Sequence, residues 1–124
     1  MNEIDVIYNR YGAPILRLLD NGRIVSFPGK SIGFIKDGNL FNYLGKYVGW
    51  FENGVMRDRD GHCVGFGENP SDTPAPFFPF KQFKPFPGFV EFEPFRSFTE
   101  FVPFKPFKSF SWSEKDPISL FFSQ

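Results

Sequence analysis

The sequence has little of the chemistry on which most small enzymes and metalloproteins depend. It contains one cysteine, Cys63, and one histidine, His62, so no internal disulfide can form and no cluster of metal ligands is present. We interpret this adjacent pair as neighbours of a turn. A Ser/His/Asp triad cannot be assembled convincingly from a single histidine. We therefore expect no catalytic, metal-binding or cofactor-binding residues, and we do not expect an enzyme.

The sequence also has no charge excess, and we expect neither a signal peptide nor a membrane-spanning segment. Its 14 basic residues balance 14 acidic ones, which argues against a protein that holds nucleic acid or another anionic partner by charge. The N-terminus is polar and acidic, unlike a signal peptide. No stretch reaches the roughly 20 apolar residues of a membrane-spanning helix. These features predict a cytoplasmic protein without a membrane span.

A sixteen-residue repeat occupies the first seventy residues. Each unit holds two apolar runs of about five residues, rich in residue types that favour strands. Three units end in Asn-Gly or Asp-Gly, the strongest short signal for a type I′ hairpin turn. The repeat is marked by two sets of turn glycines, Gly22, Gly38 and Gly54, and Gly12, Gly29, Gly45 and Gly61. The second set has one extra residue in its first interval.

This pattern predicts eight short antiparallel strands in four hairpins. The expected strands are residues 4–9, 14–19, 23–27, 31–35, 39–43, 47–51, 55–58 and 63–67. Gly33, Gly49 and Gly65 occupy equivalent places inside the second strand of their units. Because glycine weakens a strand, its recurrence indicates either the close approach of another backbone or a local β-bulge. Leu16 takes this place in the first unit, where it either fills a central gap or breaks the symmetry.

Several stretches carry a resemblance to a known family. They are residues 32–38, residues 48–54, residues 109–113 and the Phe121-Phe122 pair. On these stretches the chain resembles the four-fold β-flower proteins of bacteria, over most of its length. The resemblance implies a four-fold arrangement of β-hairpins, no established biochemical activity, and no catalytic residues to carry over. The predicted fold class is therefore mainly β, with pseudo-four-fold symmetry.

A phenylalanine stripe follows the repeats, with one phenylalanine at every third position. Its members are Phe77, Phe80, Phe83, Phe86, Phe89, Phe92, Phe95, Phe98, Phe101, Phe104, Phe107 and Phe110. A period of three fits neither a strand nor an α-helix, but it is the period of a polyproline II helix. Prolines directly before stripe residues, as at Pro79 and Pro85, favour the same conformation. The stripe predicts one aromatic edge, with two other edges that can face water.

We divide the chain into four parts: a β-hairpin repeat domain (1–70), a linker (71–76), the polyproline-II arm (77–112) and a C-terminal docking segment (113–124). A straight arm would be about 100 Å long, whereas a seventy-residue domain is about 25–30 Å across. The arm must therefore bend, fold back or leave for another chain. Pro87-Gly88 is the expected bend, and a weak nine-residue echo in the arm favours a fold-back.

The leading functional hypothesis is a non-catalytic structural or protein-interaction module. Fully burying a phenylalanine is worth about 1.5–3 kcal/mol, so we expect the stripe to pack on its own or a neighbouring chain. The predicted partner is a second copy or another protein. The alternative is a ligand-binding module for a carbohydrate or a small apolar molecule, using Tyr8, Tyr43, Tyr47 and Trp50. The hydrophobic faces of small strands demand the same residue types, so core packing also explains these four.

Overall fold

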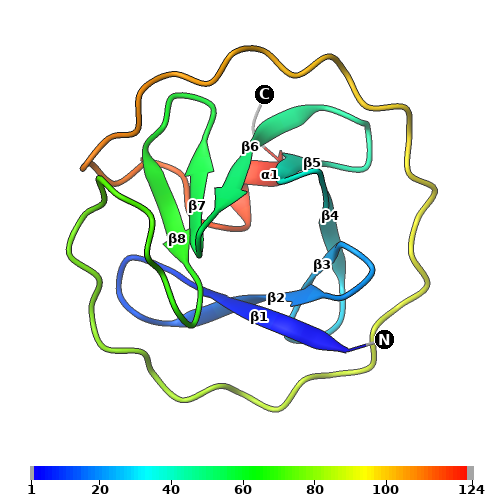
Figure 1. Ribbon diagram of the computed structural model, residues 1–124. Helices are drawn as coiled ribbons and strands as arrows, with labels where there is room; N and C mark the ends of the chain where they lie inside the picture. Colours follow the sequence, from blue (N-terminus) through cyan, green and yellow to red (C-terminus); the bar gives the residue numbers. More distant parts are fainter. Residues whose placement is uncertain (1, 123–124) are drawn as a thin grey trace.

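The computed structural model describes residues 2–122, which contain a closed barrel of eight antiparallel strands (Figure 1). Each strand pairs with the next along the chain, and the pair Tyr8–Phe66 joins the last strand to the first. The strands are β1 (Glu3–Tyr8), β2 (Pro14–Leu19), β3 (Arg23–Ser26), β4 (Ser31–Lys36), β5 (Asn39–Phe41), β6 (Tyr47–Glu52), β7 (Val55–Asp58) and β8 (Cys63–Phe66). The predicted mainly-β fold of four hairpins is confirmed, and the four units close around an axis.

Two of the three turns predicted to be type I′ have that conformation. Asp37 and Asn53 have φ angles of 52° and 46°, and the glycine after each is also left-handed, as a type I′ turn requires. Asn21 does not have a positive φ, so the turn between β2 and β3 is not type I′. This loop has three residues rather than two, and only Gly22 is left-handed. The longer loop also accounts for the extra residue in the first repeat interval.

A β-bulge recurs at the same place in the first strand of every unit. The register shifts lie at Ile7/Tyr8, Ile24/Val25, Leu40/Phe41 and Met56/Arg57. The strand glycines pair directly with the residue before three of these shifts. A Cβ atom at Gly49 would lie 2.0 Å from the carbonyl oxygen of Arg57 in the next unit. The bulge and the close backbone approach are therefore both present. Each strand glycine lies opposite a bulge, where a side chain would collide with the neighbouring backbone.

The barrel core is built from equivalent residues of the four units and closed by the chain end. Ile7, Ile24, Leu40 and Met56 hold corresponding places and are all buried. Leu16, which replaces glycine in the first unit, is fully buried in this core. The short helix α1 (Ser119–Phe122) adds Leu120 and Phe121 to the same cluster. The ring of Phe121 occupies the space above Gly33, where a Cβ atom would lie only 2.4 Å away.

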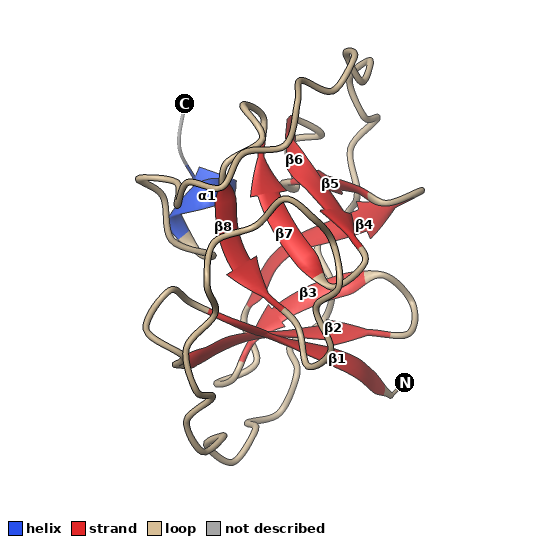
Figure 2. Cartoon of the chain, turned by 60° about the vertical axis from the view of Figure 1, so that its left-hand side comes forward, coloured by secondary structure: helices blue, strands red, loops and turns tan. Residues whose placement is uncertain are grey.

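The arm encircles the barrel (Figure 1, green through yellow to orange). Figure 2 shows the barrel from another side, with the strands in red and the loops in tan around them. Residues 77–109 form neither helix nor strand. Of the three alternatives, the arm bends: it curves continuously around the circumference and does not fold back on itself in the way that the nine-residue echo suggested (Figure 1). Gly88 does not adopt a positive φ. Its N–H donates to the carbonyl of Phe27 at 2.6 Å, and a Cβ atom there would lie 2.4 Å from the carbonyl oxygen of Pro28.

Candidate functional site

The arm is held at four equivalent turns of the barrel, which we call the docking turns. Each joins the two strands of one unit and ends in a left-handed glycine with φ between 82° and 108°. The residue three places earlier accepts the glycine N–H with its carbonyl and other N–H groups of the turn with its side chain. These capping residues are Asn9, Ser26, Asn42 and Asp58, and the glycines are Gly12, Gly29, Gly45 and Gly61. Asx-type bonds of this kind leave the glycine carbonyl free to accept from another segment.

The arm uses those free carbonyls at regular intervals of nine residues. The donors are the backbone N–H groups of Gln82, Glu91, Glu100 and Ser109, at 2.8, 3.0, 2.9 and 3.1 Å from the four glycine oxygens. A Cβ atom at Gly29 would lie 1.8 Å from the carbonyl oxygen of Phe89, so the arm runs directly over the glycine. Nine arm residues therefore span one barrel unit. The nine-residue echo in the sequence is this register.

The side chains at the same arm positions adapt to each unit. The carboxylate of Glu91 accepts the N–H of Ser31 at 2.8 Å, and the carboxylate of Glu100 accepts that of Tyr47 at 2.7 Å. The corresponding place in the first unit is Pro14, which has no N–H to donate. There the arm carries Gln82, which donates its amide to the carbonyl of Tyr11 instead. The hydrogen bond from the Ser31 N–H lowers the pKa of Glu91 despite the opposing effect of desolvation.

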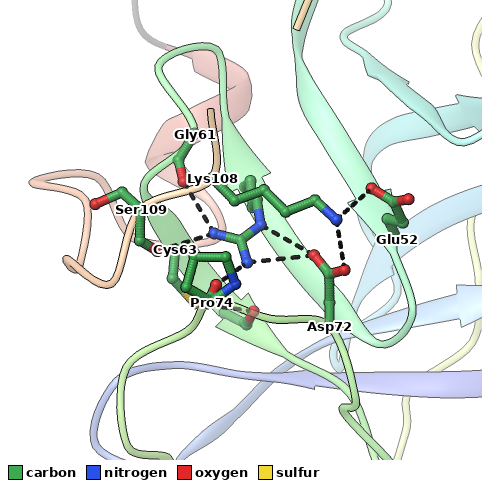
Figure 3. A network of polar contacts seen from close by, with 9 residues as sticks. Glu52, Gly61, Cys63, Asp72, Pro74, Lys108 and Ser109 are labelled. Carbon is green, nitrogen blue, oxygen red and sulfur yellow. Dashed lines mark hydrogen bonds and ion pairs between the residues drawn. The ribbon is translucent and has the colours of Figure 1, made fainter. Parts of the chain in front are cut away.

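Arg57 joins the two ends of the segment that encircles the barrel. Figure 3 shows its partners Gly61, Asp72, Pro74 and Ser109 gathered in one place. Its side chain is fully buried. It donates to the carbonyl of Pro74, in the linker before the arm, and at 3.1 Å to that of Ser109, near the end of the arm. The same guanidinium donates to the Gly61 carbonyl at 2.9 Å and pairs with the buried carboxylate of Asp72 at 3.2 Å. We call Arg57 and Asp72 the clasp, because they tie the linker, the fourth docking turn and the arm end together.

Further contacts reinforce the clasp. The amine of Lys108 lies 2.7 Å from Asp72 and 3.3 Å from Glu52, and the hydrogen bond to Asp72 is the main reason why its pKa is raised. Beyond the clasp, Cys63 pairs with the chain around Trp112 in a parallel bridge. The Cys63 N–H donates to Ser111, and its carbonyl accepts from Ser113. Burial raises the pKa of the Cys63 thiol to about 12.

The phenylalanine stripe faces solvent along its whole length. Relative exposure of its rings ranges from 71% at Phe110 to 103% at Phe104. This arrangement is the reverse of the predicted one, in which the other two edges faced water. The backbone and the polar side chains of the arm find hydrogen-bond partners on the barrel, whereas the barrel core is already filled by strand residues and α1. The rings are left on the outside as a continuous belt.

The four aromatic residues proposed as ligand contacts do not line one common groove. Tyr8, Tyr47 and Trp50 are buried and Tyr43 is partly buried. Two of them donate their hydroxyls, one to the segment that follows β8 and the other to the arm. Tyr8 donates to Glu68 at 3.0 Å, and Tyr43 donates to Glu93 at 2.9 Å. Burial and then these hydrogen bonds raise the pKa of both phenols, that of Tyr43 to about 12.

Three hollows recur at equivalent places, each between the second strand of one unit and the docking turn of the next. Their volumes are about 470, 270 and 60 Å³. The facing pairs are Ile32 with Tyr43 in the largest, Val64 with Arg10 in the next, and Val48 with Arg59 in the smallest. The side chains of α1 contribute to the largest and the smallest. Of the four proposed ligand residues, Tyr43 lines the 470 Å³ hollow, and Trp50 lines a separate hollow of about 250 Å³ beside Lys105.

Metal-ligating side chains do not cluster in the part of the chain that the structure describes. Among residues 2–122, no three His, Cys, Asp or Glu side chains are placed to hold a metal ion. No helix in this range is long and apolar enough to cross a membrane. The polar residues that hold the arm, Arg57, Asp72, Glu91 and Glu100, were not predicted from the sequence. One signal in the sequence could have indicated Arg57: it is a charged residue at the strand position where the second and third units carry the apolar Val25 and Phe41.

A closed barrel of four bulged hairpins, encircled by the chain's own aromatic arm, defines a class of small β-repeat proteins. The family model described as 4-fold beta flower protein matches residues 5–122. The chain therefore belongs to the 4-fold beta flower family. Searches of the curated proteins and of the solved structures found no match.

Proposed function

We propose that this protein is a non-catalytic structural module that assembles through its phenylalanine belt. The observation that carries the proposal is the outward exposure of all twelve stripe rings on an otherwise well-bonded arm. Monomeric soluble proteins rarely expose large contiguous apolar patches, and such patches commonly mark interaction sites. The polyproline II conformation predicted for the arm places these rings on one edge, where a partner can cover them together.

The energetics favour a covered belt. Each ring that moves from water into an apolar contact contributes about 1.5–3 kcal/mol. The ordering entropy of the arm is already offset within the chain by its bonds to the docking turns, so a partner does not have to order it. A preformed aromatic surface of this kind is well suited to assembly.

Multi-angle light scattering after size-exclusion chromatography tests this function. The full chain is compared with a variant in which the twelve stripe phenylalanines are replaced by glutamine. Because the rings contact solvent rather than the barrel, the variant is expected to keep its circular dichroism spectrum. We expect the full chain to elute as a multimer and the variant as a monomer. A full chain that stays monomeric at millimolar concentration would contradict assembly between copies of this chain.

A second candidate function is ligand binding, favoured by the recurring hollows. The largest, at about 470 Å³, is within the size range of small-molecule sites and is lined by Ile32, Tyr43 and Phe121. Nuclear magnetic resonance titration with methyl glucoside and with hexanol tests both proposed ligand classes. Binding predicts shifts confined to Tyr43 and Leu44 and their neighbours. Shifts that are absent, or spread over the arm instead, would remove this candidate.

A further inference from the structure

We infer that the partner of the belt is a second copy of this chain, and that each quarter of the belt forms a separate contact. The inference rests on the proposed function. It adds the identity of the partner and the number of contacts that one belt can make. A quarter is the set of three rings carried by the nine arm residues that serve one docking turn. The quarters are Phe77, Phe80 and Phe83; Phe86, Phe89 and Phe92; Phe95, Phe98 and Phe101; and Phe104, Phe107 and Phe110.

One quarter is large enough to make an interface. An aromatic side chain buries about 150–250 Å² when it is fully covered. Two facing quarters bring six rings together, which corresponds to about 900–1,500 Å² of buried surface. Specific protein interfaces need about 1,000 Å² in total. The contact area of a single pair of quarters therefore suffices for association.

The spacing of the stripe makes it complementary to itself. At the polyproline II rise of about 3.1 Å per residue, neighbouring rings are about 9 Å apart. If a ring from a second stripe enters each interval, ring centroids become about 4.5 Å apart along the stripe. Aromatic pairs favour centroid distances of about 4.5–7 Å. Two copies can thus interdigitate without changing either backbone.

The charges beside the stripe favour an apolar partner over a charged one. Glu93 pairs with Arg96 at 2.6 Å, and Lys84 pairs with Glu68 at 2.6 Å. Lys108 is engaged by the clasp, and Glu91 accepts a backbone N–H of the barrel. These groups already have partners within the chain, so the rings dominate what the belt offers. A second copy presents the same apolar surface.

The closed belt also determines how the assembly grows. Its quarters follow the four units around the barrel axis, so they face different directions around the circumference (Figure 1). Contacts between quarters therefore do not close after one dimer. Further copies can add to each quarter around the circumference, so the assembly can extend without limit in the plane of the belt.

A valence series of the full-length chain tests the inference. Phenylalanine is changed to glutamine in three quarters, in two opposite quarters or in none, and mass is followed by sedimentation velocity over a concentration series. We expect the variant with one intact quarter to stop at twice the monomer mass. The variant with two opposite quarters should form chains of increasing mass, and the unchanged protein should form sheets visible by electron microscopy.

Other outcomes overturn the inference. If the unchanged protein assembles but the one-quarter variant stays monomeric, the valence is wrong although assembly through the belt still holds. If the unchanged protein forms only a closed dimer, planar growth is wrong. If it is monomeric alone but sediments with dioleoylphosphatidylcholine vesicles, the partner is a lipid surface. If it is monomeric under both conditions, the proposed function fails as well.

Discussion

The guanidinium of Arg57 and the carbonyl oxygen of Ser109, 52 residues apart in the chain, lie 3.1 Å apart. Through this bond, and through its bond to Pro74, one buried side chain holds the linker that leads into the encircling arm and the end of the arm. An arm that is tied at both ends and at the docking turns behaves as part of the domain. The rings that it carries are consequently displayed in a fixed order.

Substituting Arg57 should destabilise the whole protein. In Arg57→Met, Asp72 loses its buried partner, and the carbonyls of Gly61, Pro74 and Ser109 lose a donor. Removing one member of a buried pair costs about 3–5 kcal/mol in the free energy of unfolding. Urea denaturation measures this change.

The matched control is Arg17→Met, which removes a more exposed pair between Arg17 and Glu3. Exposed pairs contribute about 0–1 kcal/mol, so the control should be nearly neutral. Equal effects of the two substitutions would show that the clasp does not have the importance assigned to it here.

Replacing a docking-turn glycine should release the arm locally. Gly45→Ala places a Cβ atom 2.0 Å from the carbonyl oxygen of Phe98, so the arm must lift from this turn. Gly38→Ala is the control, because its φ of 78° resembles the 82° of Gly45 but its nearest contact is 3.6 Å. Both changes strain a left-handed position, at about 1–2 kcal/mol. Only Gly45→Ala should speed amide exchange at Glu100, and equal exchange in both variants would contradict the docking geometry.

Acid should loosen the arm at Glu91. Its pKa is lowered in the folded chain, chiefly by the hydrogen bond from the Ser31 N–H. A group with a lowered folded pKa stabilises above its unfolded pKa, about 4.3, and this contribution is lost as the pH falls through the folded value. We expect the Ser31 amide, corrected for intrinsic rates, to lose exchange protection as the pH falls below the unfolded pKa, about 4.3, and through the lower folded value.

The variant Glu91→Gln provides the comparison for this titration. Its side-chain amide does not titrate but keeps an oxygen that can accept from Ser31. The protection of Ser31 should therefore become less dependent on pH in the variant. A wild-type protein with the same protection at pH 3 and pH 6 would refute the role of this carboxylate.

Cys63 should report on closure of the arm end. Burial raises its thiol pKa to about 12, so it holds little reactive thiolate at pH 8. We expect iodoacetamide to label the native protein very slowly and the denatured protein quickly. Ser113→Pro removes the N–H that donates to the Cys63 carbonyl and should increase the native labelling rate, whereas Ser97→Ala, far along the arm, should not. Rapid labelling of the unchanged protein would contradict a closed arm end.

Much of the barrel could be predicted from the sequence because its signals are local. Asp37-Gly38 and Asn53-Gly54 form their turns from backbone preferences of two residues. The turn at Gly22 is not type I′ because its loop has one extra residue. The spacing from Gly12 to Gly29 showed that the first interval is one residue longer, but not that the extra residue lies in this loop. Closure of the barrel requires pairing between β1 and β8, about sixty residues apart, which no local pattern specifies.

The arm was harder to predict because its partners are distant in sequence. The period of three identified one aromatic edge, but not the direction that this edge faces. That direction depends on whether the barrel offers an apolar surface or polar acceptors. The docking turns offer the carbonyls of Gly12, Gly29, Gly45 and Gly61, so the backbone of the arm turns inwards. The nine-residue repeat of the arm and the sixteen-residue repeat of the barrel were both visible in the sequence. What the sequence did not show is that one arm repeat spans one barrel unit.

Residue-resolved hydrogen exchange of the native protein tests the account most directly. The central claim is that nine arm residues match one barrel unit, with the rings facing outwards. We therefore predict protected amides at Gln82, Glu91, Glu100 and Ser109, separated by rapidly exchanging stripe amides such as Phe92 and Phe101. Uniformly rapid exchange along the arm, or protection of the stripe amides instead, would contradict the encircling register.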